Sequence, residues 1–181
     1  RTLDAQNFFS GYAERLKHGL ISNTAHWAEL LNFNTSDIDY TALKQLVGRS
    51  VQVKEDIVEQ DPFEHGIRKA LNLGHTVGHA FESMALAENR PVLHGYAVAW
   101  GIVCELYLSH LKVGFPKEKM RQTIQFIKDN YGVFTFDCKK YEQLYAFMTH
   151  DKKNTSGTIN FTLLKDIGDI RINQIADKDT I

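Results

Sequence analysis

The sequence has 181 residues, which is enough for one domain with a substantial core. Hydrophobic residues make up 43% and charged residues 24%, which excludes a disordered or fibrous chain. The formal net charge is -1, which excludes a general electrostatic attraction to nucleic acid or to an anionic membrane surface. Any site for an anionic ligand must therefore come from the local placement of Lys and Arg.

Taken in chain order, the apolar residues recur mostly at spacings of three and four, which predicts helices. Asp4 and Thr24 are suitable caps for the first two, because a short polar side chain can accept hydrogen bonds from first-turn N–H groups. Pro62 marks the end of the third helix, and Pro116 fits the first turn of the sixth. The seven expected helices cover approximately residues 4–21, 24–33, 40–60, 67–87, 94–111, 116–131 and 140–150.

The C-terminal part of the sequence changes character. Residues 158–164 (TINFTLL) alternate and are rich in β-branched side chains, and residues 167–170 (IGDI) predict a turn followed by a second short strand. No repeat, low-complexity segment or linker is evident. We therefore expect residues 1–181 to form one mainly α domain, a multi-helix bundle with one small C-terminal β-hairpin.

The two cysteines, Cys104 and Cys138, show no CxxC or other metal-type spacing. We expect reduced thiols and a cytoplasmic protein. No apolar run approaches the ~18 residues that span a bilayer, and no signal peptide is visible, so we expect no membrane partner. The sequence begins at Arg1 rather than Met, and we expect it to be a fragment of a longer chain.

The segment NLGHTVGH, residues 72–79, is the densest polar motif. His75 and His79 are four residues apart, so they share one face of a helix. Two glycines within one turn cost on the order of 1 kcal/mol each relative to Ala, which indicates a close approach to the backbone. A third histidine, His94, stands at a predicted helix start, and neutral imidazole is a common zinc ligand. The spacing favours His75 and His79 as joint ligands, but it does not choose among the three histidines.

Other polar residues give weaker signals. Glu14 and Lys17 lie three apart on one helical face, and alone they are typical of a solvated charge pair. Arg68 and Asn72 extend the histidine pair into one polar stripe, which requires either solvent or a ligand rich in hydroxyl and anionic groups. The basic pair Lys152–Lys153 is either solvated or a clamp for phosphate or carboxylate.

Four segments together resemble the 3-dehydroquinate synthase family. They are GYAERLKHGLI (11–21), RKALNLGHTVGHAFE (68–82), LHGYAVAWG (93–101) and DKKNTSGTINFTLLKDIG (151–168), in the family's order and across essentially the whole chain. The resemblance implies a C-terminal metal- and substrate-binding domain. It also implies an N-terminal NAD-binding, Rossmann-like domain that is absent from this sequence. Tyr96 departs from the family pattern, where many members have Glu, but it is none of the residues carried over.

The resemblance implies an activity and a set of site residues. The family converts 3-deoxy-D-arabino-heptulosonate 7-phosphate (DAHP) to 3-dehydroquinate and phosphate in the shikimate pathway, using NAD+ and a divalent metal, Zn2+ or Co2+. The implied metal ligands are Glu14, His75 and His94, in place of the His75–His79 pair. The other implied roles are catalysis for His79, Lys17, Glu64 and Asn72, substrate binding for Lys54, Arg68, Asn72 and one of the pair Lys152 and Lys153, and a cofactor contact for Thr2.

Three other functions remain as alternatives. Another sugar-phosphate cyclase, such as a 2-deoxy-scyllo-inosose synthase, would share the metal site, although a substrate with a carboxylate is favoured by Arg68, Asn72, His79 and Lys152. An iron- or glycerol-type alcohol dehydrogenase would share the helical histidines, but the helix with Glu14 and Lys17 and the segment DKK (151–153) argue against it. A non-catalytic scaffold would need no metal ligands. The resemblance also implies a homodimer, and we expect the chain to be inactive without an NAD-binding domain.

Overall fold

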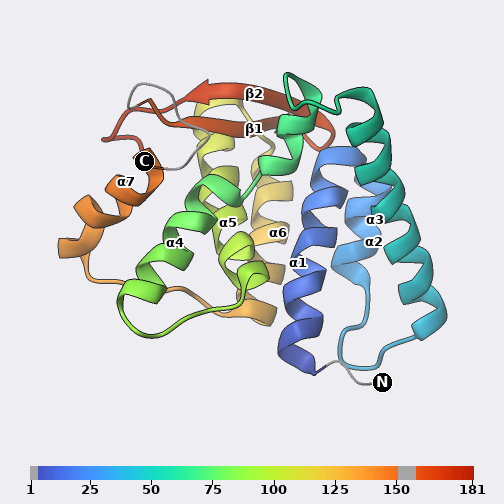
Figure 1. Cartoon of the computed structure of the whole chain (residues 1–181). Helices are drawn as coiled ribbons and strands as arrows, with labels where there is room; N and C mark the ends of the chain where they lie inside the picture. Colours follow the sequence, from blue (N-terminus) through green and yellow to red (C-terminus); the bar gives the residue numbers. More distant parts are fainter. Residues whose placement is uncertain (1–3, 151–157) are drawn as a thin grey trace.

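The computed structural model describes residues 4–150 and 158–181 and confirms the mainly α fold class with one C-terminal hairpin (Figure 1). Within these ranges, seven α-helices and two short 3-10 helices precede the two strands. In chain order the elements are α1 Ala5–Ser22, α2 Thr24–Asn32, α3 Tyr40–Gln60, η1 Ile67–Asn72, α4 His75–Ala87, α5 His94–Val113, α6 Lys117–Tyr131, η2 Cys138–Lys140, α7 Tyr141–Thr149, β1 Asn160–Asp166 and β2 Asp169–Ile175.

The first two helices begin at polar caps. The Asp4 side chain accepts a hydrogen bond of 2.8 Å from the Asn7 N–H, which confirms Asp4 as the cap of α1. The cap of α2 is Asn23, which accepts a 2.9 Å hydrogen bond from the His26 N–H. The prediction of Thr24 as cap was wrong by one residue, because Asn23 has the extended backbone and Thr24 is already helical.

The predicted helix over residues 67–87 is divided into η1 and α4. Gly74 separates them, with a left-handed φ of +79°. A Cβ atom at this position would lie 2.6 Å from Cγ1 of Ile102, so glycine is required for space as well as for conformation. The prediction of one continuous stripe from Arg68 to His79 was therefore wrong, because the two ends lie on different helices.

Helix α5 is the centre of the fold and packs against α1, α4, α6 and β1. Its residues Val98, Ile102 and Leu106 are completely buried. In Figure 1, α2 and α3 lie on the far side of α1, α7 lies beyond α4, and the hairpin extends across one end of the helices. None of the helices in the described ranges combines the length and the hydropathy required to cross a bilayer.

Two glycines on α5 allow neighbouring backbones to approach closely. A Cβ atom at Gly95 would lie 1.9 Å from the carbonyl oxygen of Ser10 in α1. A Cβ atom at Gly101 would lie 2.0 Å from the carbonyl oxygen of Gly74, just before α4. These contacts bring the start of α5 against α1 and its middle against the start of α4. The segments that carry Glu14, His75 and His94 are thereby placed side by side.

Candidate active site

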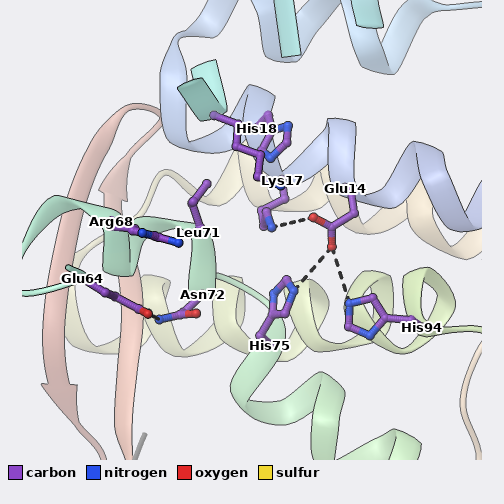
Figure 2. Close-up of a pocket in the computed structure, with 10 residues that line it drawn as sticks. Glu14, Lys17, His18, Glu64, Arg68, Leu71, Asn72, His75 and His94 are labelled. Carbon is purple, nitrogen blue, oxygen red and sulfur yellow. Dashed lines mark hydrogen bonds and ion pairs between the residues drawn. The ribbon is translucent and has the colours of Figure 1, made fainter. Parts of the chain in front are cut away.

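Three side chains from three helices converge at one point, as Figure 2 shows. Oε1 of Glu14, on α1, lies 3.4 Å from Nε2 of His75 and 3.7 Å from Nε2 of His94. These two histidines are the first residues of α4 and α5. The three donor atoms lie within 4.8 Å of one another, a spacing that could accommodate one metal ion.

The far nitrogens of both imidazoles are held by acceptors. Nδ1–H of His75 donates to the Leu73 carbonyl at 3.0 Å, and Nδ1–H of His94 donates to Oε2 of Glu82 at 3.0 Å. In a neutral ring this places the lone pair on Nε2, toward Glu14. Oε1 of Glu14 is buried and accepts no hydrogen bond from the described residues. Three electron-pair donors therefore face one another, and a cation between them would stabilise all three.

The electrostatics favour the protonation states that bind metal. Burial would raise the pKa of the Glu14 carboxyl, but His75 and Lys17 outweigh it and hold that pKa well below its usual value. Burial lowers the pKa of His75, and the nearby Glu14 opposes this shift only in part. Glu14 is therefore ionised and His75 neutral near pH 7, as metal ligands must be.

A pocket of about 300 Å³ opens beside these three residues. Lys17 is only 3% exposed, and its Nζ donates to Oε2 of Glu14 at 2.6 Å, which compensates the burial of its charge. Lys54 on α3 and Arg68 on η1 also line the pocket and add further positive charge to its wall. The lining residues are Glu14, Lys17, His18, Lys54, Glu64, Arg68, Leu71, Asn72, His75 and His94.

The loop between α3 and η1 carries part of the pocket wall. Asp61 organises this loop, because its carboxylate accepts hydrogen bonds from the N–H groups of His65, Gly66 and Arg68 at 2.7–3.0 Å. At the start of the loop, the Pro62 carbonyl accepts a hydrogen bond of 2.5 Å from the Arg68 guanidinium. The sequence analysis missed Asp61, although an Asp before Pro is a common signal for a turn.

The structure brings most of the predicted site residues together, although their chemical roles remain predictions. Glu64 and Asn72 are joined at the pocket wall, where the Asn72 side-chain amide donates to Oε1 of Glu64 at 2.8 Å. His79 lies beside His75 and His94, with ring centroids 5.4 and 5.9 Å away, but it does not line the pocket. The predictions for Thr2, Lys152 and Lys153 lie outside the described residues.

A second group of possible donors overlaps the first. It consists of His79, Glu82 and His94. Neither group contains both His75 and His79, so the pairing favoured by spacing alone does not match the geometry. Glu82 was missed by the sequence analysis, since its link to His94 depends on the packing of α4 against α5.

The sequence analysis also missed His18, which lines the pocket and is 4% exposed. Its Nδ1 lies 2.6 Å from the Ser50 hydroxyl oxygen, which links α1 to α3. Burial, reinforced by the charge of Lys17, lowers the pKa of His18 to about 3. The folded protein therefore holds a neutral imidazole at pH values where the unfolded chain is already protonated, with an unfolded pKa of ~6.5.

This burial predicts a pH-dependent contribution to stability. The contribution is complete above pH ~6.5 and is lost as the pH falls toward 3, because protons bind the unfolded chain first. Between pH 6.5 and 5, we expect wild type to lose up to ~1.4 kcal/mol per pH unit more than the His18→Asn variant. Urea unfolding of both proteins across this range measures the difference. If the free energy of unfolding depended on pH in the same way in both proteins, the expectation would be contradicted.

Comparison with known proteins identifies the family. The family model described as "3-dehydroquinate synthase C-terminal" matches residues 11–154. A 3-dehydroquinate synthase from Parabacteroides distasonis is 58% identical over 181 residues, which cover 100% of this chain and 51% of that protein. One from Leptospira interrogans is 40% identical over 179 residues, which cover 95% of this chain and 48% of that protein.

Solved structures share the fold at lower identity. A 2-epi-5-epi-valiolone synthase from Streptomyces hygroscopicus, solved with NAD+ and Zn2+ bound, has a TM-score of 0.81 at 21% identity, covering 99% of this chain and 50% of its own. A 2-deoxy-scyllo-inosose synthase complexed with carbaglucose-6-phosphate, NAD+ and Co2+ has a TM-score of 0.77 at 18% identity. The match covers 97% of this chain and 50% of that one. The chain spans about half the length of the curated relatives that it matches. Its sequence nevertheless matches the C-terminal family model over most of its residues, and the chain therefore belongs to the 3-dehydroquinate synthase family.

Proposed function

We propose that this chain is the metal- and substrate-binding part of an enzyme that converts DAHP to 3-dehydroquinate and phosphate. The observation that carries the proposal is the convergence of Glu14, His75 and His94 at the edge of a cationic pocket. The curated relatives named 3-dehydroquinate synthase support this substrate over those of the other cyclases, whose identity to this chain is far lower.

The donor set fits a divalent metal ion. One carboxylate oxygen and two imidazole nitrogens are a common ligand set of catalytic zinc sites, which keep a further position for substrate. We propose Glu14, His75 and His94 as the ligands of Zn2+ or Co2+. When bound, such an ion acts as a Lewis acid toward the hydroxyl groups of a substrate. The metals in the two cyclase structures support this choice.

The remaining pocket residues suit an anionic, hydroxyl-rich ligand. We propose that Lys17, Lys54 and Arg68 bind the carboxylate and phosphate of DAHP, since ammonium and guanidinium groups form strong charge-assisted hydrogen bonds with both. Asn72, held against Glu64, supplies an amide for a hydroxyl group. His79 is proposed as an acid–base residue beside the metal ligands, since its ring lies next to those of His75 and His94 rather than in the pocket wall. One lysine of the pair Lys152 and Lys153 is proposed as a further substrate contact.

The nucleotide cofactor requires a second domain in this proposal. We propose that an N-terminal Rossmann-like domain binds most of the NAD+, with Thr2 as one contact from this chain. NAD+ in both cyclase structures and the half-length match to the relatives support it. A homodimer and a cytoplasmic location stay predictions from the resemblance.

Joining the chain to the remaining half of the Parabacteroides distasonis relative tests the proposed reaction. We expect the joined protein, with NAD+ and Zn2+, to release phosphate from DAHP and to form 3-dehydroquinate. The 181-residue chain alone should bind Zn2+ weakly and NAD+ negligibly, and it should not convert DAHP. A phosphate-release assay and calorimetry measure these properties. Tight binding of NAD+ by the chain alone, or a folded but inactive joined protein, would contradict the proposal.

Two lysines on α3 provide a matched pair for the substrate pocket. Lys54 lines the pocket, whereas Lys44 is exposed on the same helix and does not line it. In the joined protein, Lys54→Ala should raise the KM for DAHP about tenfold or more, since a lost charge-assisted hydrogen bond is worth roughly 1.5–3 kcal/mol. Lys44→Ala should leave KM unchanged. Equal effects of the two substitutions would remove Lys54 from the pocket assignment.

A further inference from the structure

A buried carboxylate outside the pocket connects the two helices that carry the histidines. Glu105 lies on α5 and is completely buried. Its Oε2 accepts the Gly74 N–H at 2.5 Å, and its Oε1 accepts the Val77 N–H at 3.1 Å. Both donors belong to the start of α4, so a side chain of α5 caps the N-terminus of α4.

Glu105 takes over the task that an N-cap residue normally performs. A cap side chain accepts hydrogen bonds from the N–H groups of the first turn, and Val77 is the third residue of α4. The cap position is Gly74, which has no side chain and must be glycine because of its φ of +79° and its contact with Ile102. The usual Ser, Thr or Asp is therefore excluded, and the acceptor comes from α5 instead.

The position of this carboxylate explains why a charged group can be buried here. The N-terminal end of a helix carries a partial positive charge from its unpaired N–H groups, which stabilises an anion. Two direct N–H hydrogen bonds add to this stabilisation. A carboxylate accepts with both oxygens, whereas a glutamine of the same shape accepts with only one and places a donor against the other N–H.

The consequence for the candidate metal site is geometric. Along the chain, His75 falls between Gly74 and Val77, whose N–H groups donate to Glu105. His94 is the first residue of α5, the helix that carries Glu105. The close contact of Gly101 with the Gly74 carbonyl acts on the same junction. The relative position of the two imidazoles therefore depends on the contact between Glu105 and the start of α4.

We propose that Glu105 is a positioning residue that holds His75 in register with His94 for metal binding. The inference rests on the proposed metal site. Glu105 lies outside the pocket and contacts neither substrate nor metal in this scheme, so its effect passes through the helix terminus. Removing it should loosen the metal site even where the rest of the fold is retained.

Metal binding by the 181-residue chain tests the proposal. We expect Glu105→Gln to weaken Zn2+ and Co2+ binding by about 10–100-fold, the range typical of residues that support metal ligands. The absorption spectrum of bound Co2+ should also change in Glu105→Gln, because the ligand geometry changes. The matched control is Ser109→Ala, one turn further along α5. Its hydroxyl donates to the Glu105 backbone carbonyl within α5 and accepts the Leu164 N–H, so it links α5 to β1 and leaves the Glu105 carboxylate in place. The control should unfold at a lower temperature but retain the metal affinity and the Co2+ spectrum.

The possible results distinguish failure of the proposed metal site from failure of the role of Glu105. If wild type binds no metal, the proposed metal site fails and this inference fails with it. If wild type binds metal and Glu105→Gln binds it equally well with the same spectrum, the metal site stands and the role of Glu105 is overturned. If Glu105→Gln does not fold, hydrogen exchange in wild type decides. Slow exchange of the Gly74 and Val77 amides, quickened by the shorter Glu105→Asp, supports the contact, and fast exchange in wild type refutes it.

Discussion

Replacing His75 with Ala is expected to abolish metal binding by this chain while leaving it folded. His75 supplies one of three converging donors, and its Nε2 lies 3.4 Å from the buried oxygen of Glu14. Loss of a direct ligand should exceed the ~10–100-fold loss caused by outer residues, so the affinity should fall more than ~100-fold. The substitution sits at the pocket edge rather than in the apolar core, so the unfolding temperature should change little. Metal analysis and circular dichroism of the same sample measure both properties.

The control for this prediction is a histidine outside the cluster. His65 is exposed on the loop before η1 and belongs to neither group of converging donors. His65→Ala should retain full metal content. An unchanged metal content in His75→Ala, or an equal loss in His65→Ala, would contradict the assignment of His75 as a ligand.

Gly101→Ala is expected to destabilise the fold strongly, because the added methyl group would force α5 away from α4. The new Cβ would lie 2.0 Å from the Gly74 carbonyl oxygen and 2.7 Å from the Gly78 nitrogen. Both obstacles are backbone atoms, which cannot rotate away as a side chain can. Overpacking of this kind typically costs ~1–3 kcal/mol, and we expect the upper end of that range or more. Metal binding should weaken as well, because α4 must move away from α5.

The matched control is Gly48→Ala in the middle of α3, where no atom lies within 4 Å of the added methyl group. A glycine within a helix is less stable than Ala by roughly 0.5–1 kcal/mol, so this variant should be more stable than wild type. The free energy of unfolding in urea measures both variants. A Gly101→Ala protein as stable as wild type would show that α4 and α5 are not in close backbone contact.

The sequence analysis predicted most of the helices because local rules decide them. The apolar spacing predicted the helix over residues 40–60 and Pro62 predicted its end, and the structure reproduces these bounds as α3. The break at Gly74 was missed, since the same residues read equally well as one continuous helix. The helix breaks at the left-handed backbone of Gly74, where Ile102 and Val98 on α5 leave no room for a side chain, and no local pattern contains that packing.

The candidate site shows the same division between local and long-range information. Spacing within the chain drew attention to His75 and His79, which are neighbours on one helix. It could not pair His75 with Glu14, because that contact depends on how α1 packs beside α4 and α5. The pairing of His75 with Glu14 was predicted only from the resemblance to a family, not from the spacing of the residues. The sequence assigned no role to Glu82 or Glu105, because their contacts with His94 and Gly74 depend on the packing of α4 against α5.

Diffraction data from the metal-loaded protein, collected at the zinc absorption edge, would locate the ion. We expect one ion within ~2.0–2.2 Å of Oε1 of Glu14 and of the Nε2 atoms of His75 and His94. An ion held instead by His79, Glu82 and His94, or no ordered ion at saturating Zn2+, would contradict this expectation.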